Sequence, residues 1–347
     1  MEAREIVQQY GWNTTCSQIL NPGIELWYAK GGDAVVGYVR RARVRVVVGA
    51  PVCSEERLDE VLDEWHADAD RARDGVCYFG AEARLRSRLG TCPGFSNVVL
   101  GAQPVWSPSS FIKAFEKSRS LRYQLNRARN KGVSVEEWPS ARGDDPRLWK
   151  ILGEWLATRG LPAMRFMVEP NTLAQLGDRR LFVGVREGVP VGFVVLSPVP
   201  ARDGWLTEQF PRGRGAPNGT IDLILYEAVR AVKEDAFVTM GIVPLSKRAG
   251  TEEGNPPWLN GVLGWARAHG RRFYDFEGLD LFKAKFGPDH WEPIYAISRE
   301  QTFSPHTLWA IGGAFSAGSP IMALAGGMGR AIRQEWRWAT APKGRAT

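Results

Sequence analysis

A glycine- and arginine-rich segment, residues 211–219, has the composition of an anion-binding loop. It contains Arg212 and Arg214 and leads into a helical pattern that begins at Thr220. Free amides and the dipole at a helix N-terminus attract phosphate. The segment partly matches the R-x-x-G-x-A loop by which acetyltransferases hold the pyrophosphate of coenzyme A, with Pro217 at the last, mismatched position. A Gly- and Pro-rich surface loop without a ligand is the alternative interpretation.

Cations and aromatic rings follow one another closely near the end of the globular part. Lys283 and Lys285 precede Trp291 and Tyr295 in this stretch. The two ammonium groups can contact phosphate, and the rings can stack on a base. A basic turn beside aromatic residues of the core is the other interpretation, and the pattern alone does not decide between them.

A third feature is the segment from Phe111 to Lys131, which has helical periodicity and an almost entirely basic exposed face. Its apolar stripe consists of Ile112, Phe115, Leu121, Leu125 and Ala128. Its cations are Lys113, Lys117, Arg119, Arg122, Arg127, Arg129 and Lys131. A solvated face usually mixes both signs of charge, so this excess predicts a polyanionic partner, either nucleic acid or acidic lipid.

Composition and missing motifs narrow the chemistry further. The chain of 347 residues is 44% apolar and 24% charged, which is typical of a globular protein. Its net charge of +7 favours an anionic partner, but many proteins of this size are mildly basic without one. H-E-x-x-H, G-x-S-x-G, Walker and C-x-x-C patterns are missing from the sequence. We therefore expect neither a metal site nor a serine nucleophile. Four well-separated cysteines predict reduced thiols, and the polar start Met1–Tyr10 does not resemble a signal peptide, so we expect a cytoplasmic protein.

Alternating strand-like and helix-like stretches predict an α/β or α+β fold. In the first half, the expected strands are 34–40, 43–48, 76–81 and 97–102, and the expected helix is 54–73, capped by Ser54. Arg43 and Arg45 alternate with Val44 and Val46, as in a half-buried strand. In the second half, the expected strands are 180–186, 191–197, 205–210, 237–242, 273–276 and 293–298, and the expected helices are 148–159, 220–234 and 257–269.

Both halves thus run from short strands through a helix to further strands, and we interpret them as two copies of one acyltransferase-type fold. A polar stretch near residue 140 divides them into an N-terminal domain, 1–140, and a C-terminal catalytic domain, 141–300. Residues 301–347 form an apolar and then basic tail, which predicts a membrane-associating segment. Small-residue helices packed on the body of the protein are the alternative for this tail.

Three stretches together carry a resemblance to one family. Ser120–Gly132 resembles its S-L-R-x-x-x-N-R helix, and Asn218–Asp222 with Met240–Ser246 resembles its N-G-x-x-D and G-x-x-P-L-S segments. Phe276–Tyr295 resembles its G-L-x-x-F-K-x-K-F-x-P-x-W-E-P-x-Y signature. The family is the C-terminal domain of phosphatidylglycerol lysyl- and alanyltransferases, also described as a domain of unknown function in stand-alone proteins. The likeness covers residues 20–300.

The resemblance implies two tandem GNAT-like acyltransferase folds with mixed sheets flanked by helices, the second fold holding the active centre. It implies transfer of an amino acid from aminoacyl-tRNA to a lipid hydroxyl, that of phosphatidylglycerol or of another lipid. Aminoacyl-tRNA is already an activated ester, so we expect it as co-substrate with no cofactor and no metal. The membrane domain of full-length family members is not in this sequence, so a soluble acceptor stays open. A peripheral position at the inner face of an anionic membrane is a further expectation.

The resemblance also implies roles for individual residues. Asp222, Glu208 and Glu277 are the candidate carboxylates, either as general base or as partner of the substrate's α-ammonium group. Arg212 would pair with a phosphate of lipid or RNA, for which its planar fork is suited. The residues expected to bind substrate, with the two lysines holding the tRNA acceptor end, are Asn218, Gly219, Lys283 and Lys285. Those expected to contact tRNA phosphates are Arg119, Arg122, Arg127 and Lys131.

Two other functions stay open at this point. One is a coenzyme A-dependent N- or O-acyltransferase, which the glycine loop favours and Pro217 disfavours. The other is a non-catalytic module that binds membrane or RNA. The sequence does not determine the transferred amino acid, the acceptor or the oligomeric state.

Overall fold

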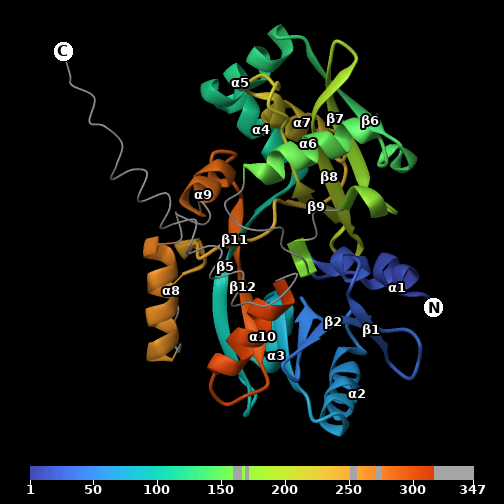
Figure 1. The fold of residues 1–347 in the computed structure, drawn as a ribbon, viewed down its shortest axis with the longest axis vertical. Helices are drawn as coiled ribbons and strands as arrows, with labels where there is room; N and C mark the ends of the chain where they lie inside the picture. The colour runs from blue at the N-terminus through green and yellow to red at the C-terminus, as the bar shows by residue number, and fades with distance from the viewer. Residues whose placement is uncertain (159–165, 169–171, 251–255, 270–275, 316–347) are drawn as a thin grey trace, which may run out of the picture.

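Residues 1–158, 166–168, 172–250, 256–269 and 276–315 are described by a computed structural model of the protein. They contain one mixed sheet of twelve strands in the order β1-β2-β3-β4-β12-β5-β10-β9-β8-β7-β6, with β11 paired to β5 beside this path (Figure 1). The strands are β1 (Glu25–Tyr28), β2 (Val35–Arg41), β3 (Val44–Val48), β4 (Gly75–Ala81), β5 (Ser96–Trp106), β6 (Val133–Trp138), β7 (Arg180–Arg186), β8 (Val189–Val199), β9 (Gly204–Gln209), β10 (Phe237–Thr239), β11 (Val243–Pro244) and β12 (His290–Ser298).

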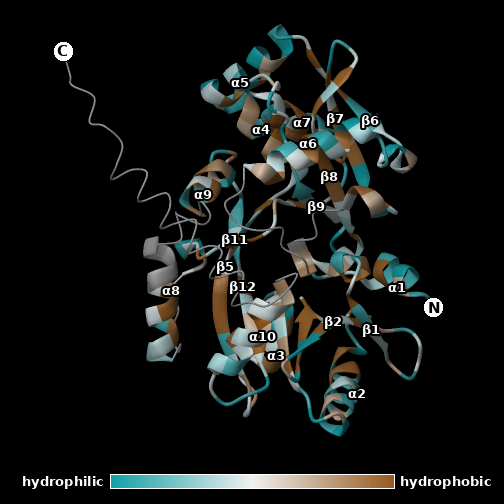
Figure 2. Cartoon of the chain, in the orientation of Figure 1, coloured by the Kyte–Doolittle hydropathy of each residue, from teal (hydrophilic) through white to brown (hydrophobic). Residues whose placement is uncertain are grey.

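Helices cover both faces of this sheet. They are α1 (Ala3–Tyr10), α2 (Leu58–Arg71), α3 (Ala83–Leu89), α4 (Pro108–Lys117), α5 (Arg119–Asn130), α6 (Pro146–Ala157), α7 (Thr220–Arg230), α8 (Pro257–His269), α9 (Phe276–Ala284) and α10 (Pro305–Phe315). Hydrophilic residues dominate outer helices such as α5, and apolar residues follow the central strands (Figure 2). The expected fold class, a mixed α/β sheet flanked by helices, is confirmed.

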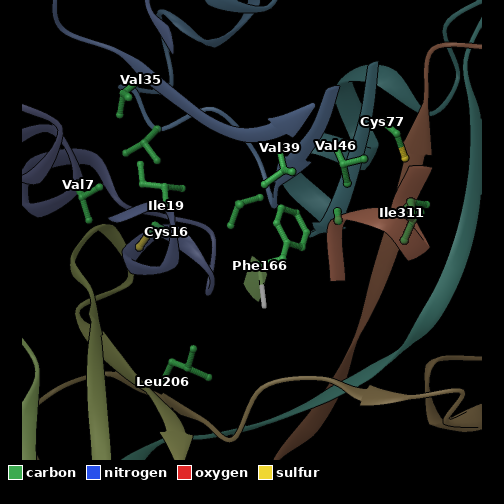
Figure 3. Close-up of a cluster of buried hydrophobic side chains, with 14 of the residues drawn as sticks. Val7, Cys16, Ile19, Val35, Val39, Val46, Cys77, Phe166, Leu206 and Ile311 are labelled. Carbon is green, nitrogen blue, oxygen red and sulfur yellow. The ribbon is translucent and has the colours of Figure 1, made fainter. Parts of the chain in front are cut away.

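Alternating residues of the first strands point into two separate cores. Val36 and Val47 pack with α2 and α3 on one face of the sheet. Their neighbours Val35 and Val46 pack with α1 and α10 on the other face. Figure 3 shows this second core, in which Val39, Val46 and Cys77 of the strands lie beside Phe166 and Ile311. In the second half, α4, α5 and α7 cover one face and α6 the other.

Each half contains two parallel neighbouring strands joined by a helix. Helix α2 connects β3 to β4, and these two strands pair in parallel. Helix α7 connects β9 to β10, and these strands also pair in parallel. This repeated strand–helix–strand unit is the structural basis of the tandem interpretation. The division at residues 140 and 300 stays a prediction. Any division has to accommodate β12, which lies in the sheet of the first half, and α4 and α5, which pack against α7.

Three local expectations need correction. β3 is buried on both faces, because Arg45 forms ion pairs with Asp74 and Asp68 at 3.1 and 2.8 Å instead of facing solvent. The helix expected from residue 54 begins at Leu58. The single long helix expected from 111 to 131 is two helices, α4 and α5, since Ser118 has an extended backbone and its hydroxyl accepts from the Leu121 amide as an N-cap.

Two further expectations concern the end of the second half. The strand expected at 273–276 falls outside the described residues except for Phe276, which begins α9. The strand expected at 293–298 exists as β12, but it lies between β4 and β5 and does not close an edge. Strands β1 and β6 are the edges of the sheet within the described part of the chain.

The beginning of the apolar tail belongs to the core. Helix α10 packs on β2 and β3 and buries Ala310, Ile311 and Ala314. Arg41 Nε donates to the Gly313 carbonyl at 3.2 Å, and the Phe315 ring meets the Phe79 ring at 5.1 Å between centroids. The hypothesis that the tail is separate from the core from Thr307 onward is therefore wrong for α10, and packed small-residue helix is the correct alternative there. Residues 316–347, with the basic cluster, lie outside the described residues.

Among the described helices, none is long and apolar enough to cross a membrane.

We predict that Ile311→Ala lowers the free energy of unfolding by about 2–4 kcal/mol, because it leaves a cavity between α10 and the sheet. Trp309→Ala in the same helix should change it by less than about 1 kcal/mol, since Trp309 is 43% exposed while Ile311 is 6% exposed. Urea unfolding of both variants measures the difference. Equal stability of the two variants would show that α10 does not contribute to the core.

Candidate active site

The loop 211–219 connects β9 to the start of α7, and β8 holds it in place. The Phe193 amide donates to the Pro211 carbonyl at 3.1 Å, and the Gly213 amide donates to the Val191 carbonyl at 3.0 Å. These two bonds fix the beginning of the loop to a buried strand. The loop therefore has a defined path into α7.

Gly219 is required at the end of this loop for two reasons. Its φ is +86°, and a Cβ placed there would lie 2.2 Å from the carbonyl oxygen of Gln124 in α5. Only glycine adopts this conformation without strain and allows the backbones of α7 and α5 to come so close. Gly219 was expected to bind substrate, and its backbone also lines the pocket described next.

A pocket of about 390 Å³ opens at the first turn of α7. Its charged lining residues are Glu154, Arg212, Arg214 and Asp222. Its aromatic lining residues are Trp155, Phe210 and Phe282. The rings of Phe210 and Phe282 stack with their centroids 5.5 Å apart. Charges of both signs beside aromatic walls suit a ligand that is itself both polar and apolar.

Asp222, which lines the pocket, forms an ion pair with Lys285, which lies beside the lining residues. Lys285 Nζ lies 2.5 Å from Asp222 Oδ1, and the side chains are 33% and 10% exposed. Asp222 is the third residue of α7, where the helix dipole favours a carboxylate. The same ammonium lies 4.2 Å from the centre of the Phe282 ring. A carboxylate that lines the cavity is thus paired with an ammonium beside it.

Arg212 and Asn218 interact at the mouth of the pocket. The Arg212 guanidinium donates to Asn218 Oδ1 at 3.3 Å, and both residues are exposed. This weak, accessible contact leaves the rest of the guanidinium available to an anionic group. Deeper in the loop, the Arg214 amide donates to a carboxylate oxygen of Glu154 at 2.9 Å. One loop amide that an anionic ligand would need is therefore occupied by an acidic side chain.

Glu208 lies at a different place from the pocket. Its carboxylate pairs with Arg179 at 2.9 Å and accepts from the Ser197 hydroxyl, and both charged side chains are 5% exposed. Arg179 also donates to the Ser17 carbonyl at 3.2 Å and to Asn21 Oδ1 at 3.1 Å. Glu208 therefore takes part in a buried network that joins the N-terminal residues to the second half. This geometry does not fit the predicted catalytic role.

Lys283 also has a position that does not fit the predicted contact with phosphate. It is 3% exposed, and its Nζ donates to the carbonyls of Met240, Gly241 and Ile242 at 2.6, 2.9 and 3.0 Å. An ammonium has three donors, so all of them are used within the protein. Burial lowers the pKa of Lys283 to about 7. Lys283 fastens the segment after β10 to α9 and positions neighbouring residues of the site.

Glu277 is exposed in the first turn of α9 and is not among the described residues that line the pocket. Its predicted role as a catalytic carboxylate stays a prediction. The structure thus brings Asp222, Arg212 and Lys285 together with the Asn218-Gly219 turn. It separates Glu208 and Lys283 from them.

The basic residues expected to contact tRNA lie close to the same loop. Arg119, Arg122, Arg127 and Lys131 are all exposed on or just after α5. Within the described part of the chain, they have no ion-pair partner, whereas the neighbouring Arg129 pairs with Glu227 at 2.9 Å. Because the Gln124 backbone touches Gly219, this basic surface begins next to the pocket.

Sequence reasoning missed the aromatic and acidic walls of the pocket. Phe282 stands in the F-K-x-K-F motif that was recognised, so that motif could have indicated it. Phe210 directly precedes the loop and could have been included with it. Glu154 and Trp155 come from α6, about sixty residues earlier in the chain, and no local signal marks them. As for metal ligands, no cluster of three or more His, Cys, Asp or Glu side chains occurs in the ranges that the structure describes.

The fold and the site define a mixed α/β protein whose pocket, between a loop and a helix start, is lined by a carboxylate that pairs with a lysine. The family model described as phosphatidylglycerol lysyltransferase, C-terminal, matches residues 4–298. The chain belongs to this family.

Similar proteins agree with this assignment. The phosphatidylglycerol lysyltransferase of Bacillus subtilis (strain 168) is 24% identical over 291 residues, which are 82% of this chain and 33% of that protein. The phosphatidylglycerol lysyltransferase of Staphylococcus aureus (strain MRSA252) is 24% identical over 324 residues, which are 89% of this chain and 36% of that protein. The chain therefore spans about a third of the length of these curated relatives.

Solved structures show the same fold. The C-terminal domain of a protein named as a lysylphosphatidylglycerol synthetase from Agrobacterium fabrum superposes with a TM-score of 0.75 at 21% identity, covering 91% of this chain and 96% of that one. L-PGS from Bacillus licheniformis gives a TM-score of 0.71 at 20% identity, covering 95% and 96%. FemX gives 0.53 at 10% identity, covering 90% and 98%.

We predict that the two lysines of the K-x-K motif differ in what they contribute. Lys283→Met should lower the free energy of unfolding by about 1–3 kcal/mol, because three carbonyls lose their donor. Lys285→Met should lower it by about 1 kcal/mol or less, since the Lys285 side chain is 33% exposed. Chemical unfolding and circular dichroism of both variants separate the two effects.

The pH dependence of Lys283 provides a second check. Its pKa falls from 10.5 to about 7 on folding, so between these values the unfolded chain binds the additional proton. The wild type should therefore gain stability relative to Lys283→Met as the pH rises above 7, by up to about 1.4 kcal/mol per pH unit. A difference between the two proteins that is constant from pH 6 to pH 9 would contradict the buried position of this ammonium.

Gly219→Ala should lower the free energy of unfolding by at least about 2 kcal/mol, through a strained φ and a clash with the Gln124 carbonyl. Gly215→Ala is the matched control, because a Cβ there meets nothing within 4 Å. Thermal unfolding of both variants measures the difference. If Gly219→Ala is as stable as the control, the close approach of α7 to α5 is not present in solution.

Proposed function

We propose that this chain transfers an aminoacyl group from aminoacyl-tRNA to a lipid hydroxyl. The observation that carries the proposal is that Asp222 lines a pocket of mixed charge and pairs with Lys285 at 2.5 Å, with the basic surface of α5 against the same loop. The relatives are named as transferases of lysine to phosphatidylglycerol, which supports a lipid acceptor. The donor, the acceptor and the chemical step are our proposal.

The reaction exchanges one ester for another. The acceptor hydroxyl oxygen attacks the carbonyl carbon of the aminoacyl ester, and the bond from that carbon to the ribose oxygen of the tRNA breaks. The Asp222 carboxylate takes the hydroxyl proton, and the Lys285 ammonium donates a proton to the departing ribose oxygen. Their ion pair allows the proton to return from Asp222 to Lys285, so both groups recover their starting state. No oxidant, nucleotide or covalent intermediate is needed.

The remaining lining residues have roles that fit these substrates. Arg212 at the mouth of the pocket can hold a phosphate of the lipid or of the terminal nucleotide, because its guanidinium is exposed and only weakly occupied. Glu154 offers a second carboxylate for the α-ammonium group of the amino acid. The aromatic walls formed by Trp155, Phe210 and Phe282 exclude water from the ester. Positioning and electrostatics are sufficient for this chemistry.

Coenzyme A is a less suitable donor for this loop. The Glu154 carboxylate accepts from the Arg214 amide at 2.9 Å, and a pyrophosphate bound to the same amide would have to displace that carboxylate. Pro217, at the last position of the loop motif, has no amide hydrogen to donate. Both features disfavour the acetyltransferase alternative.

A lipid acceptor places the protein at a membrane surface during catalysis. The net charge of +7 and the exposed cations of α5 favour an anionic leaflet or RNA. We propose a peripheral position at the inner face of the membrane, where aminoacyl-tRNA is present. The experiment that tests the function is expression of the full chain in a host without aminoacylated lipids, followed by mass spectrometry of the lipid extract.

We predict that Asp222→Asn reduces transfer at least about 100-fold, because an amide cannot accept the hydroxyl proton. Arg212→Ala should raise KM for the phosphate-bearing substrate more than it lowers kcat. Glu234→Gln is the matched control, since Glu234 is 86% exposed just beyond α7 and remote from the pocket lining. Transfer is measured with purified protein, labelled aminoacyl-tRNA and phosphatidylglycerol vesicles. If Asp222→Asn transfers as fast as Glu234→Gln, Asp222 is not the base.

A further inference from the structure

An exposed aromatic ring stands in the middle of the basic face of α5. Tyr123 is 60% exposed, and no large apolar residue of the described chain is more exposed than this. A tyrosine in a solvated helix face usually covers part of its ring against the helix body. This ring is presented to solvent among cations, which is the arrangement of a contact surface for a charged, aromatic ligand.

The neighbours of Tyr123 on the helix surface are cationic. Arg119 precedes it by four residues and Arg127 follows it by four, so the three side chains lie along one line of the helix. Arg122 lies beside this line, and its guanidinium donates to the Glu116 carbonyl, which holds it at the junction of α4 and α5. In the described part of the molecule, neither Arg119 nor Arg127 has a carboxylate within ion-pair distance.

This line of residues lies next to the candidate active site. Gln124, the residue after Tyr123, has its carbonyl oxygen against Gly219, whose backbone lines the pocket with Asp222. Helices α5 and α7 pack on each other along this contact. A chain that runs over the exposed face of α5 therefore has a short path to the Asp222–Lys285 pair.

We propose that Tyr123, with Arg119 and Arg127, is a stacking platform for the unpaired bases at the 3′ end of the RNA donor. The proposal rests on the proposed function, in which aminoacyl-tRNA brings its esterified 3′ end to the pocket. Aromatic rings stack on the faces of unpaired bases, and the flanking guanidinium groups bind the phosphates between them. The single-stranded end thus reaches the pocket already held on both its bases and its backbone.

An RNA single strand suits this surface better than a membrane does. A helix that lies in a membrane surface buries an apolar face in the lipid, but the apolar face of α5, Leu121, Leu125 and Ala128, is already buried in the protein. The outward face offers one aromatic ring among cations. That combination is typical of single-strand recognition, where stacking and charge alternate along the ligand.

The test is binding of the full chain to a labelled RNA stem that ends in a four-nucleotide unpaired 3′ tail, compared with the same stem with a blunt end. Tyr123→Ala should weaken binding of the tailed stem roughly 5- to 150-fold, the change that corresponds to one stacked base, and leave the blunt stem unaffected. Tyr123→Phe should bind as the wild type does, because it keeps the ring. Fluorescence anisotropy at fixed ionic strength gives the dissociation constants.

Salt dependence separates the ring from the cations. Tyr123→Ala should leave the slope of log K against log salt unchanged, whereas Arg127→Ala should reduce it by roughly 0.7 for a single strand. Tyr28→Ala is the matched control, since Tyr28 is 42% exposed on β1, at the edge of the sheet far from α5 in strand order. The control should leave both binding and slope as in the wild type.

Several outcomes would overturn the platform. They are equal binding of the tailed stem by Tyr123→Ala and the wild type, equal losses on both stems, and failure of Tyr123→Phe to retain binding. A loss confined to phosphatidylglycerol vesicles would assign the surface to the membrane instead. The binding assay does not involve aminoacyl transfer, so a failure of the platform can be distinguished from a failure of the proposed function. If the wild type transfers from aminoacyl-tRNA but Tyr123→Ala binds the tailed stem normally, the stacking platform is wrong and the proposed function stands.

Discussion

Strand β12 lies in the centre of the sheet, although it is formed near the end of the described chain. It pairs with β5 from His290 to Ser298 and with β4 on its other side. Because β5 also pairs with β10, this one insertion joins the strands of both halves into a continuous sheet. The energetic consequence is that the two halves cannot separate without breaking the hydrogen bonds and buried faces of a central strand. α9 directly precedes β12, so the position of β12 also determines where Lys285 and Phe282 meet the pocket.

A buried polar cluster fixes this strand in register. Arg202 donates to Glu292 of β12 at 2.7 Å and to Glu82 at 3.2 Å, and Gln103 of β5 donates to Glu292 at 2.8 Å. Burial alone would raise the pKa of Glu292, but the hydrogen bonds from Arg202 outweigh it and lower that pKa. Burial raises the pKa of Glu82, and the opposing effects of Arg202 and Thr14 are too small to cancel it. Breaking a buried network of this kind by removing one partner is strongly unfavourable, whereas a fully paired network specifies one arrangement. The glutamate of the W-E-P motif therefore has a structural explanation.

Local patterns predicted most individual elements, but not how the elements join. The strands expected at 180–186 and 191–197 are present as β7 and β8, which form a hairpin whose turn residues Glu187 and Gly188 both have positive φ. The alternation of arginine and valine predicted that β3 is half-buried. The strand is buried on both faces because Arg45 pairs with Asp74, a contact that the local pattern does not show. At the site, the glycine loop indicated Arg212, and the resemblance to the family indicated Asp222. Glu208 looked equally suitable in sequence, and only the tertiary contact with Arg179 shows that its charge is already used. Charge and spacing describe what a side chain can do, whereas burial determines whether it is available.

The two lysines of the K-x-K motif show the same distinction within three residues. Helix α9 ends at Ala284, between them, so Lys283 points inward from the last turn while Lys285 follows in the turn beyond it. The inward ammonium holds the carbonyls after β10, and β10 is parallel to β9, which leads into the loop 211–219. The outward ammonium reaches Asp222 at the start of α7. Lys283 thus holds α9 at a fixed distance from the sheet. At that distance Lys285 reaches Asp222 and forms the ion pair. The pair forms because two segments more than sixty residues apart are held by the same sheet, and a change in the register of β12 would separate them before any residue of the pocket was altered.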